Sequence, residues 1–273
     1  MHRDINRNTI YIIYSAESYT INQTIQKHGA NYVHFAIFPK VSKNVLTTAK
    51  GRDIIKAQKQ KPNESQKAKR KEKEKMKISI SNGNKKMGAI PSVSLPACIT
   101  CNTSAPCFKK CYAAKISRLY TNTRNAYARN LDALDTDPAG YWLQVKAAAM
   151  TTRFFRFHVS GDIPNAAYFA DMVQTARDLP NTRFLAFTKQ YQFVNDFLNE
   201  GGTIPENLKI LFSNWGAWKC DNPHGLPVCE VIFKGNTPAD DWKICGGNCT
   251  ECACRGVGCW ELKNGEVIGI YEH

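Results

Sequence analysis

Cysteine is the residue type in this sequence most suited to metal binding, and most of the cysteines fall into two short groups. The first group has four thiols within fourteen residues: Cys98, Cys101, Cys107 and Cys111. Thiolate sulfur binds zinc and iron–sulfur clusters well and hard cations poorly. The two, five and three residues between these cysteines are irregular for a zinc knuckle, whereas a loop around a larger cluster tolerates them. The spacing alone leaves an iron–sulfur cluster, zinc and unliganded buried thiols as alternatives.

The second group has five cysteines within fifteen residues, interleaved with glycines that let a backbone turn sharply around a metal. The expected ligands of zinc or of a second iron–sulfur cluster in this group are Cys245, Cys249, Cys252 and Cys259. Cys254 is interpreted as a spare or alternate ligand. Cys220 and Cys229 precede the group closely enough in sequence to contribute ligands, but we favour the interpretation that both are small buried hydrophobic residues.

A third set of polar residues lies on and after an apolar run that predicts a strand. Arg156 and His158 alternate with apolar residues, so we expect both on one face, pointing into a barrel. Ser160, Gly161 and Asp162 follow directly. Gly161 permits a ligand to approach closely, and Asp162 can accept a hydrogen bond from a cationic amino group. The structural alternative is a helix-capping aspartate beside a turn glycine.

Strand and helix patterns alternate around these motifs. Short apolar or alternating runs predict strands at 32–38, 90–95, 153–159, 183–188 and 209–213. Amphipathic spacing predicts helices at 118–134, 141–151, 164–176 and 193–198. This alternation is typical of an α/β fold with a parallel sheet. We predict a partial (β/α) barrel, with a doubly wound sheet as the alternative.

Composition divides the chain into three predicted regions. Residues 1–77 form an N-terminal extension whose part 56–77 is a basic linker, residues 78–242 a barrel-like core with the first cysteine loop, and residues 243–273 a cysteine-rich metal-binding cap. The linker has ten Lys or Arg and three Glu, half of the net charge of +14. It is interpreted as a solvated helix or tether, with a nucleic-acid contact as the alternative.

The sequence also bears on the compartment. No stretch approaches the roughly 18 apolar residues that cross a bilayer, and no secretory signal is recognisable. We therefore expect a cytoplasmic protein with no membrane partner. Disulfides are rare in that reducing compartment, so the 11 cysteines are expected to bind metal instead.

From Ile80 to His273 the sequence resembles the phage gene product 88 family, an uncharacterised group. The motifs that support this resemblance are Ser81–Gly88, Ile90–Pro96, Cys107–Ala113, Phe154–Pro164, Phe187–Gln190 and Cys245–Cys249. The resemblance does not extend to the region before Ile80.

More distantly, the layout is similar to that of radical S-adenosylmethionine enzymes, which place three cluster cysteines in a loop after the first barrel strand. This resemblance implies that Cys101, Cys107 and Cys111 hold a 4Fe–4S cluster with one iron open to S-adenosylmethionine. The five and three residues between these cysteines differ from the three and two usual in that superfamily.

The same resemblance implies that Ser160, Gly161 and Asp162 bind the cofactor where the superfamily has Gly-Gly-Glu, with Arg156 and His158 beside them. The carboxylate of Asp162 is one methylene shorter than glutamate.

The implied activity is reductive cleavage of S-adenosylmethionine, which starts a radical reaction on an unknown substrate and needs an external electron donor. No individual catalytic residue is assigned. Two alternatives belong to other classes: a zinc-stabilised module that binds nucleic acid through residues 56–77 without catalysis, and a redox or cluster-carrying protein.

Overall fold

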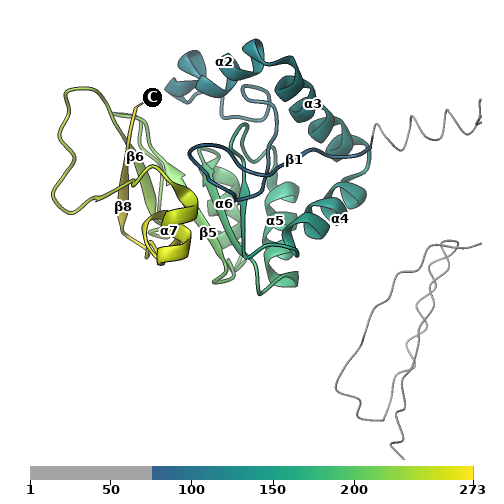
Figure 1. Cartoon of the computed structure of the whole chain (residues 1–273). Helices are drawn as coiled ribbons and strands as arrows, with labels where there is room; N and C mark the ends of the chain where they lie inside the picture. Colours follow the sequence, from purple (N-terminus) through teal and green to yellow (C-terminus); the bar gives the residue numbers. More distant parts are fainter. Residues whose placement is uncertain (1–75, 273) are drawn as a thin grey trace, which may run out of the picture. The chain divides into compact units, whose positions relative to one another are not determined.

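A mostly parallel sheet organises the part of the chain that the structure, a computed structural model, describes, namely residues 76–272 (Figure 1). Its strands are β1 (Ile80–Ser81), β2 (Ser92–Val93), β3 (Phe154–Phe157), β4 (Arg183–Thr188), β5 (Leu208–Ser213), β6 (Val228–Ile232), β7 (Lys243–Ile244) and β8 (Val267–Tyr271). The α-helices are α2 (Tyr112–Leu119), α3 (Thr121–Thr136), α4 (Pro138–Ala149), α5 (Ala166–Asp178), α6 (Tyr191–Asn199) and α7 (Cys249–Arg255). Two 3-10 turns, η1 (Pro106–Lys110) and η2 (Gly258–Trp260), complete the described elements.

The strand order confirms the α/β prediction. Within residues 76–272 the order is β1-β2-β3-β4-β5-β6-β8-β7, and all neighbours pair in parallel except β1 with β2. From β2 to β6 the strands follow one another in chain order, as they do in a (β/α) barrel. A doubly wound sheet reverses direction at a switch point, and these strands show no such reversal. The carboxyl ends of β2, β3, β4 and β5 therefore form one continuous edge.

Alternation along the strands divides the core into two faces. Phe155 and Phe157 of β3 join the apolar cluster that helices α3 to α6 cover. Phe154 joins the second cluster, on the opposite face of the sheet. That second cluster contains Ala253 of α7 and Trp260 of η2, so the cysteine-rich segment covers this face (Figure 1). We call it the inner face, because the helices of a barrel lie on the other side.

The segment from Lys243 onward shares the sheet with the core. β8 pairs in parallel with β6 along its length, and β7 pairs with β8. Between these strands, α7 begins at the N-cap Asn248, whose side chain accepts a hydrogen bond from Glu251 N, and it ends at Gly256 in the left-handed conformation. The second cysteine group is thus built into the sheet and the layer directly upon it.

Helix boundaries differ from the predicted ones for local reasons. The single helix predicted at 118–134 is two helices, because Tyr120 has extended backbone angles that end α2 and precede α3. The next helix starts at Pro138 rather than at 141, since the Asp137 side chain accepts a hydrogen bond from Gly140 N and Pro138 fits the first turn. α5 starts at Ala166 behind the N-cap Asn165.

The prediction that Arg156 and His158 share a face is wrong. His158 has a positive φ of 57°, which breaks the alternation directly after β3. Its ring lies against Tyr168 of α5, on the helix-covered side. Val159 instead packs on the inner face, in the cluster that also contains Phe154.

Two predictions lie outside the described residues: the strand at 32–38, and the basic linker up to residue 75. No helix within residues 76–272 is long and apolar enough to span a membrane.

Candidate metal and cofactor site

The loops after β2, β3 and β4 meet at the carboxyl edge of the sheet, where parallel α/β folds place their ligands. Backbone Leu95 N donates to Ser160 O at 3.0 Å, which pairs the start of the first cysteine loop with the turn after β3. The Thr100 hydroxyl accepts a hydrogen bond from Asp162 N at 3.0 Å and donates to Pro96 O at 3.2 Å. The first cysteine loop is therefore fastened directly to the predicted cofactor-binding turn.

Gly161 is required at this contact. Its φ of +77° favours glycine, and a Cβ at this position would lie 2.7 Å from both Leu95 O and Thr100 Oγ1. Any side chain would push the two loops apart. The close approach at Gly161 is made by the cysteine loop, whereas the approach of a ligand at this position stays a prediction.

The loop after β4 holds the cysteine loop from the other side. Gln190 Nε2 donates to Thr100 O at 3.1 Å, and Asn102 Nδ2 donates to Lys189 O at 3.0 Å. Phe187 of β4 lies under the guanidinium of Arg156, 4.7 Å from ring centre to Cζ. The Phe187–Gln190 motif therefore connects the first cysteine loop to the inner face.

Asp162 fastens β3 to β4. Its Oδ1 accepts hydrogen bonds from Thr188 Oγ1 at 2.6 Å and from Ile163 N at 2.8 Å, and its Oδ2 accepts one from Lys189 N at 2.8 Å. Burial raises the pKa of this carboxyl to about 6, against the lowering effect of these hydrogen bonds. A carboxylate offers about four acceptor positions. Groups of the protein occupy three of these positions, and one on Oδ2 is left. The main role of Asp162 is therefore to hold the turn after β3 against β4, as a positioning residue.

The first cysteine group lies beside this junction. Burial raises the pKa of the Cys101 thiol to about 12, with the nearby Asp162 and Cys111 adding to the effect. Burial also raises the pKa of Cys107, which the Lys189 ammonium opposes. Burial raises the pKa of Cys98, and the neighbouring Cys111 adds to the effect. Thiols in this environment stay protonated unless a cation replaces their protons.

Five cysteines share the inner face: Cys229, Cys245, Cys249, Cys252 and Cys259. Cys249 and Cys252 are three residues apart on α7 and therefore lie on one side of it. Cys229 comes from β6 and is only 3% exposed, which agrees with its interpretation as a small buried residue. Burial raises the pKa of Cys229 and that of Cys259, and Cys245 adds to the effect on Cys229 as Cys229 does to that on Cys259. Cys229 therefore also lies near the second cysteine group. Exposed Cys254 lies outside the cluster.

Arg156 brings a positive charge to this second group. Its Nη1 lies 3.8 Å from Cys249 Sγ, and its Nε is buried without a hydrogen-bond partner. A buried guanidinium is costly unless an anion lies beside it. Metal-bound thiolates are anions, whereas thiols are not. Arg156 therefore matches the charge of a metal centre held by these cysteines.

The sulfurs share regions of the fold without standing in ligand geometry. Among the described residues, no group of three or more His, Cys, Asp or Glu side chains is arranged as a formed metal site. The first group lies in the loop between β2 and α2 and on η1, whereas the inner-face cysteines extend from β6 through α7 to η2.

His158 lies apart from both groups. Its Nε2 is 3.0 Å from Tyr168 OH, and its Nδ1 has no partner. Burial lowers the His158 pKa to about 3, and the charge of Arg156 adds to this effect, so the ring is neutral. Its contacts are those of a core residue that supports the turn after β3.

A model of one protein family matches residues 55–254, which is more than half of the chain. The model describes gene product 88. The chain belongs to the gene product 88 family. The match begins at residue 55, so the expectation that the resemblance starts at Ile80 is wrong. No curated protein and no solved structure gives a significant match.

The gene product 88 match includes the whole first cysteine group and most of the second, together with Arg156 and the turn at 160–162. Cys259 lies beyond its end. The match therefore spans most of the residues that build both cysteine regions of this chain.

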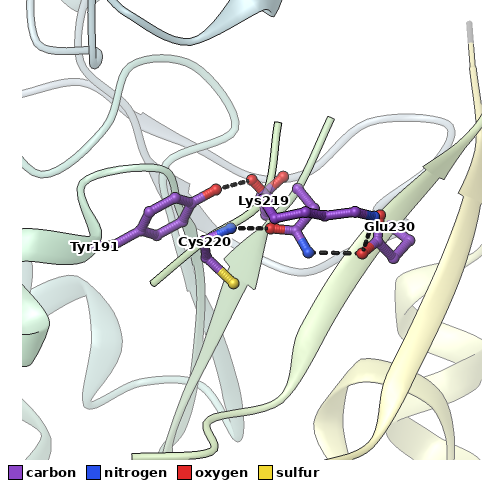
Figure 2. Close-up of polar contacts among 6 residues, drawn as sticks. Tyr191, Lys219, Cys220 and Glu230 are labelled. Atoms are coloured by element: carbon purple, nitrogen blue, oxygen red, sulfur yellow. Dashed lines mark hydrogen bonds and ion pairs between the residues drawn. The ribbon is translucent and has the colours of Figure 1, made fainter. Parts of the chain in front are cut away.

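A further polar network in this gene product 88 chain lies at the ends of β5 and β6 (Figure 2). Glu230, only 6% exposed, accepts hydrogen bonds from Asn214 Nδ2 at 2.6 Å and Lys219 Nζ at 2.8 Å. Cys220 N donates to Asn214 Oδ1 at 2.7 Å, while the Cys220 sulfur points away from these contacts. Cys220 packs against the helix-covered cluster and joins neither cysteine group.

Sequence reasoning missed the residues that hold the edge together: Thr100, Asn102, Thr188, Lys189, Gln190, Asn214 and Glu230. Three of these residues, Thr188, Lys189 and Gln190, belong to the Phe187–Gln190 motif. That motif supports the family resemblance, but the sequence alone assigns no role to its residues. Glu230 sits within the run Val228–Ile232, where one acid among apolar residues indicates a buried and paired carboxylate.

Proposed function

We propose that this gene product 88 family protein is an iron–sulfur protein of the radical S-adenosylmethionine-like type. The observation that supports this most is the contact between the first cysteine loop and the turn after β3, made by Thr100 and Gly161 at the carboxyl edge of the sheet. Three thiols and a turn for the cofactor are thereby brought to one edge, in the order that such enzymes use.

Unsatisfied polar atoms support a ligand at this edge. Buried polar groups nearly always have partners, so those without one call for an explanation. Ser160 Oγ and Arg156 Nε are both buried and unpartnered, and both belong to the predicted cofactor-binding set. A bound carboxylate or hydroxyl group would supply the missing partner to either atom.

The donor set fits the proposed cluster by its chemistry. Cys101, Cys107 and Cys111 supply the soft sulfur ligands that iron–sulfur clusters use. Burial raises the pKa of Cys107, and the Lys189 ammonium partly opposes this effect. When bound, the cluster supplies the electron that cleaves S-adenosylmethionine. The protein residues then have positional tasks: Gly161 and Thr100 hold the loop, and Asp162 keeps the turn against β4.

The inner-face cysteines form a second metal centre, holding zinc or another cluster. Cys245, Cys249, Cys252 and Cys259 remain its proposed ligands, and Cys229 is a further candidate because it lies in the same cluster. Arg156 supplies the compensating charge. This centre joins α7 to the sheet, so its first role is to hold the inner face closed.

The deciding experiment is metal and sulfide analysis of anaerobically purified protein, followed by electron paramagnetic resonance of the reduced protein with and without S-adenosylmethionine. We expect a brown protein whose reduced spectrum changes when the cofactor is added. Cys101→Ser should lose the responsive signal, whereas Cys254→Ser, at an exposed position outside the inner-face cluster, should keep it. A colourless zinc protein would contradict the proposal.

Two variants refine the ligand assignment. Ser160→Ala removes an unpartnered hydroxyl, so it should leave stability unchanged while weakening the response to S-adenosylmethionine. Cys98→Ser separates a three-thiol from a four-thiol cluster, because Cys98 lies against Cys111. Loss of the cluster in Cys98→Ser, with a spectrum indifferent to the cofactor, would leave a closed cluster and end the radical-enzyme proposal.

A further inference from the structure

The charge of the described chain is concentrated on its first part. Residues 76–131 hold nine Lys or Arg and no Asp or Glu, whereas residues 132–273 hold twelve Lys or Arg and seventeen Asp or Glu. The excess of positive charge is therefore not confined to the linker at 56–77. It continues over the first cysteine loop, α2 and α3, which are folded.

Helix α2 presents this charge together with large apolar side chains. Its buried residue is the small Ala113, while Ile116 and Leu119 are 39% and 65% exposed. An ordinary amphipathic helix buries its large apolar residues against the core. α2 does the reverse: it packs through small residues and turns its apolar stripe outward. Such a stripe marks a binding surface.

Aromatic rings and neighbouring residues extend the stripe. Tyr112 and Tyr120, at the two ends of α2, are 54% and 59% exposed, and Ile99 of the cysteine loop is 69% exposed. Five of the ten exposed large hydrophobic residues in the described chain therefore lie between positions 99 and 120. Four exposed basic residues accompany them: Lys109, Lys110, Lys115 and Arg118. None of these four is in an ion pair within residues 76–272.

We propose that this α2 surface binds single-stranded nucleic acid. Proteins that hold single strands combine basic side chains, which contact phosphates, with exposed aromatic rings on which bases stack. Both kinds of group are present on α2 and the adjoining loop. A second copy of this surface would be repelled by like charge. Residues 1–75 are an equally poor occupant, because they carry sixteen Lys or Arg and six Asp or Glu.

The surface adjoins the first cysteine loop, whose last cysteine directly precedes α2. The Tyr112 hydroxyl donates to Val159 O at 3.0 Å, next to the turn that holds Asp162. A strand lying along α2 would thus run toward the carboxyl edge of the sheet. If the proposed function holds, nucleic acid is the substrate class. The binding itself needs no metal chemistry.

The test measures fluorescence anisotropy of labelled oligothymidine, oligouridine and a duplex with the full-length anaerobic protein. Lys115→Glu/Arg118→Glu should weaken single-strand binding at least tenfold. It should also reduce the slope of log K against log salt by about 1.4, from two lost phosphate contacts. Tyr120→Ala should weaken it roughly five- to a hundredfold, because a stacked base is lost. The thymidine and uridine arms distinguish DNA from RNA.

The matched control is Lys234→Glu/Arg255→Glu, which changes the net charge equally at exposed positions outside residues 76–131. It should bind as the parent does. If both double variants weaken binding equally, or if the α2 double variant binds as the parent does, the α2 surface is not the nucleic-acid site and the proposal fails. Preference for the duplex overturns it as well. Iron content, measured on the same samples, keeps this result separate from the iron–sulfur proposal.

Discussion

Arg156 on β3 and Cys249 on α7 face each other across the inner face of the sheet, with 3.8 Å between Nη1 and Sγ. The contact joins the strand that leads into the cofactor turn with the helix that begins the cysteine-rich cover. The same guanidinium is stacked on Phe187 of the β4 motif, which continues into the residues that hold the first cysteine loop. Arg156 thus places its charge beside the inner-face cysteines, and Phe187 connects it to the edge of the sheet.

Gly161→Ala should unfold the edge of the sheet. The added Cβ would lie 2.7 Å from two oxygens, and alanine is strained at this positive φ. We expect a loss of about 3 kcal/mol or more in the free energy of unfolding by urea. Gly201→Ala is the matched control, since Gly201 has a similar φ of +83° with nothing within 4 Å, and it should cost only about 1 kcal/mol. Equal losses would show that the loop contact is unimportant.

Thr188→Val should destabilise the protein by about 1–3 kcal/mol. The valine keeps the shape but removes the hydroxyl that donates to Asp162 Oδ1, so a buried carboxylate loses a partner. Thr175→Val is its control, because the Thr175 hydroxyl is buried without any partner and its removal should be neutral or stabilising. Urea denaturation of the two variants side by side measures the difference. If the two variants lose similar amounts of unfolding free energy, the hydrogen bond from Thr188 to Asp162 does not stabilise the protein.

Stability should fall on acidification through the range in which His158 remains neutral in the folded protein. The folded pKa of about 3 is below the ordinary 6.5, so the unfolded chain binds the extra proton as the pH drops below about 6.5. The stability due to this group is present above 6.5 and is lost toward pH 3, at up to about 1.4 kcal/mol per pH unit. His158→Asn tolerates the positive φ and does not titrate. Its unfolding free energy should therefore vary less with pH than that of the parent, and parallel profiles would refute the assignment.

Cys229→Ala should lower the metal content of the inner-face centre. The Cys229 sulfur lies among the cysteines of that face, so its loss removes a candidate ligand and leaves the Arg156 charge less compensated. Metal analysis and thermal unfolding of the anaerobic protein measure both effects. Cys220→Ala changes the other cysteine that precedes this group, but it packs on the opposite face and should leave metal content as in the parent. If the metal content of Cys229→Ala equals that of the parent, Cys229 is a buried apolar residue and not a ligand.

The strands and helices that follow simple periodicity could be predicted from the sequence. The runs at 183–188 and 209–213 are strands β4 and β5 almost to the residue, because nearly continuous apolar runs are typical of parallel strands buried on both faces. β6 and β8 were not predicted. β6 carries Glu230, which accepts hydrogen bonds from Lys219 and Asn214; its place among apolar residues indicates a paired carboxylate, but no local pattern identifies these two partners.

The candidate site likewise has features that the sequence predicts and features that depend on the fold. Cysteine spacing identifies both groups, since ligand type and clustering are properties of the chain itself. The position of Cys229 beside the second cysteine group and the position of His158 away from the inner face depend on the fold of the chain. Cys229 meets the second group only because β6 pairs with β8, and His158 leaves the inner face because its φ of 57° turns the chain after β3.

The segment that covers the inner face, with α7 and η2, lies near the end of the sequence given, and this affects how the protein folds during translation. Cys249 N donates to Lys86 O, so two residues separated by more than half of the chain must meet before that face is closed. Contacts of such long sequence separation form late, because the intervening loop must first be ordered. While the ribosome is still adding the residues of α7 and β8, the inner face and its Arg156 stand open to water. The same interval exposes the apolar side chains of Phe154 and Leu185 to chaperones.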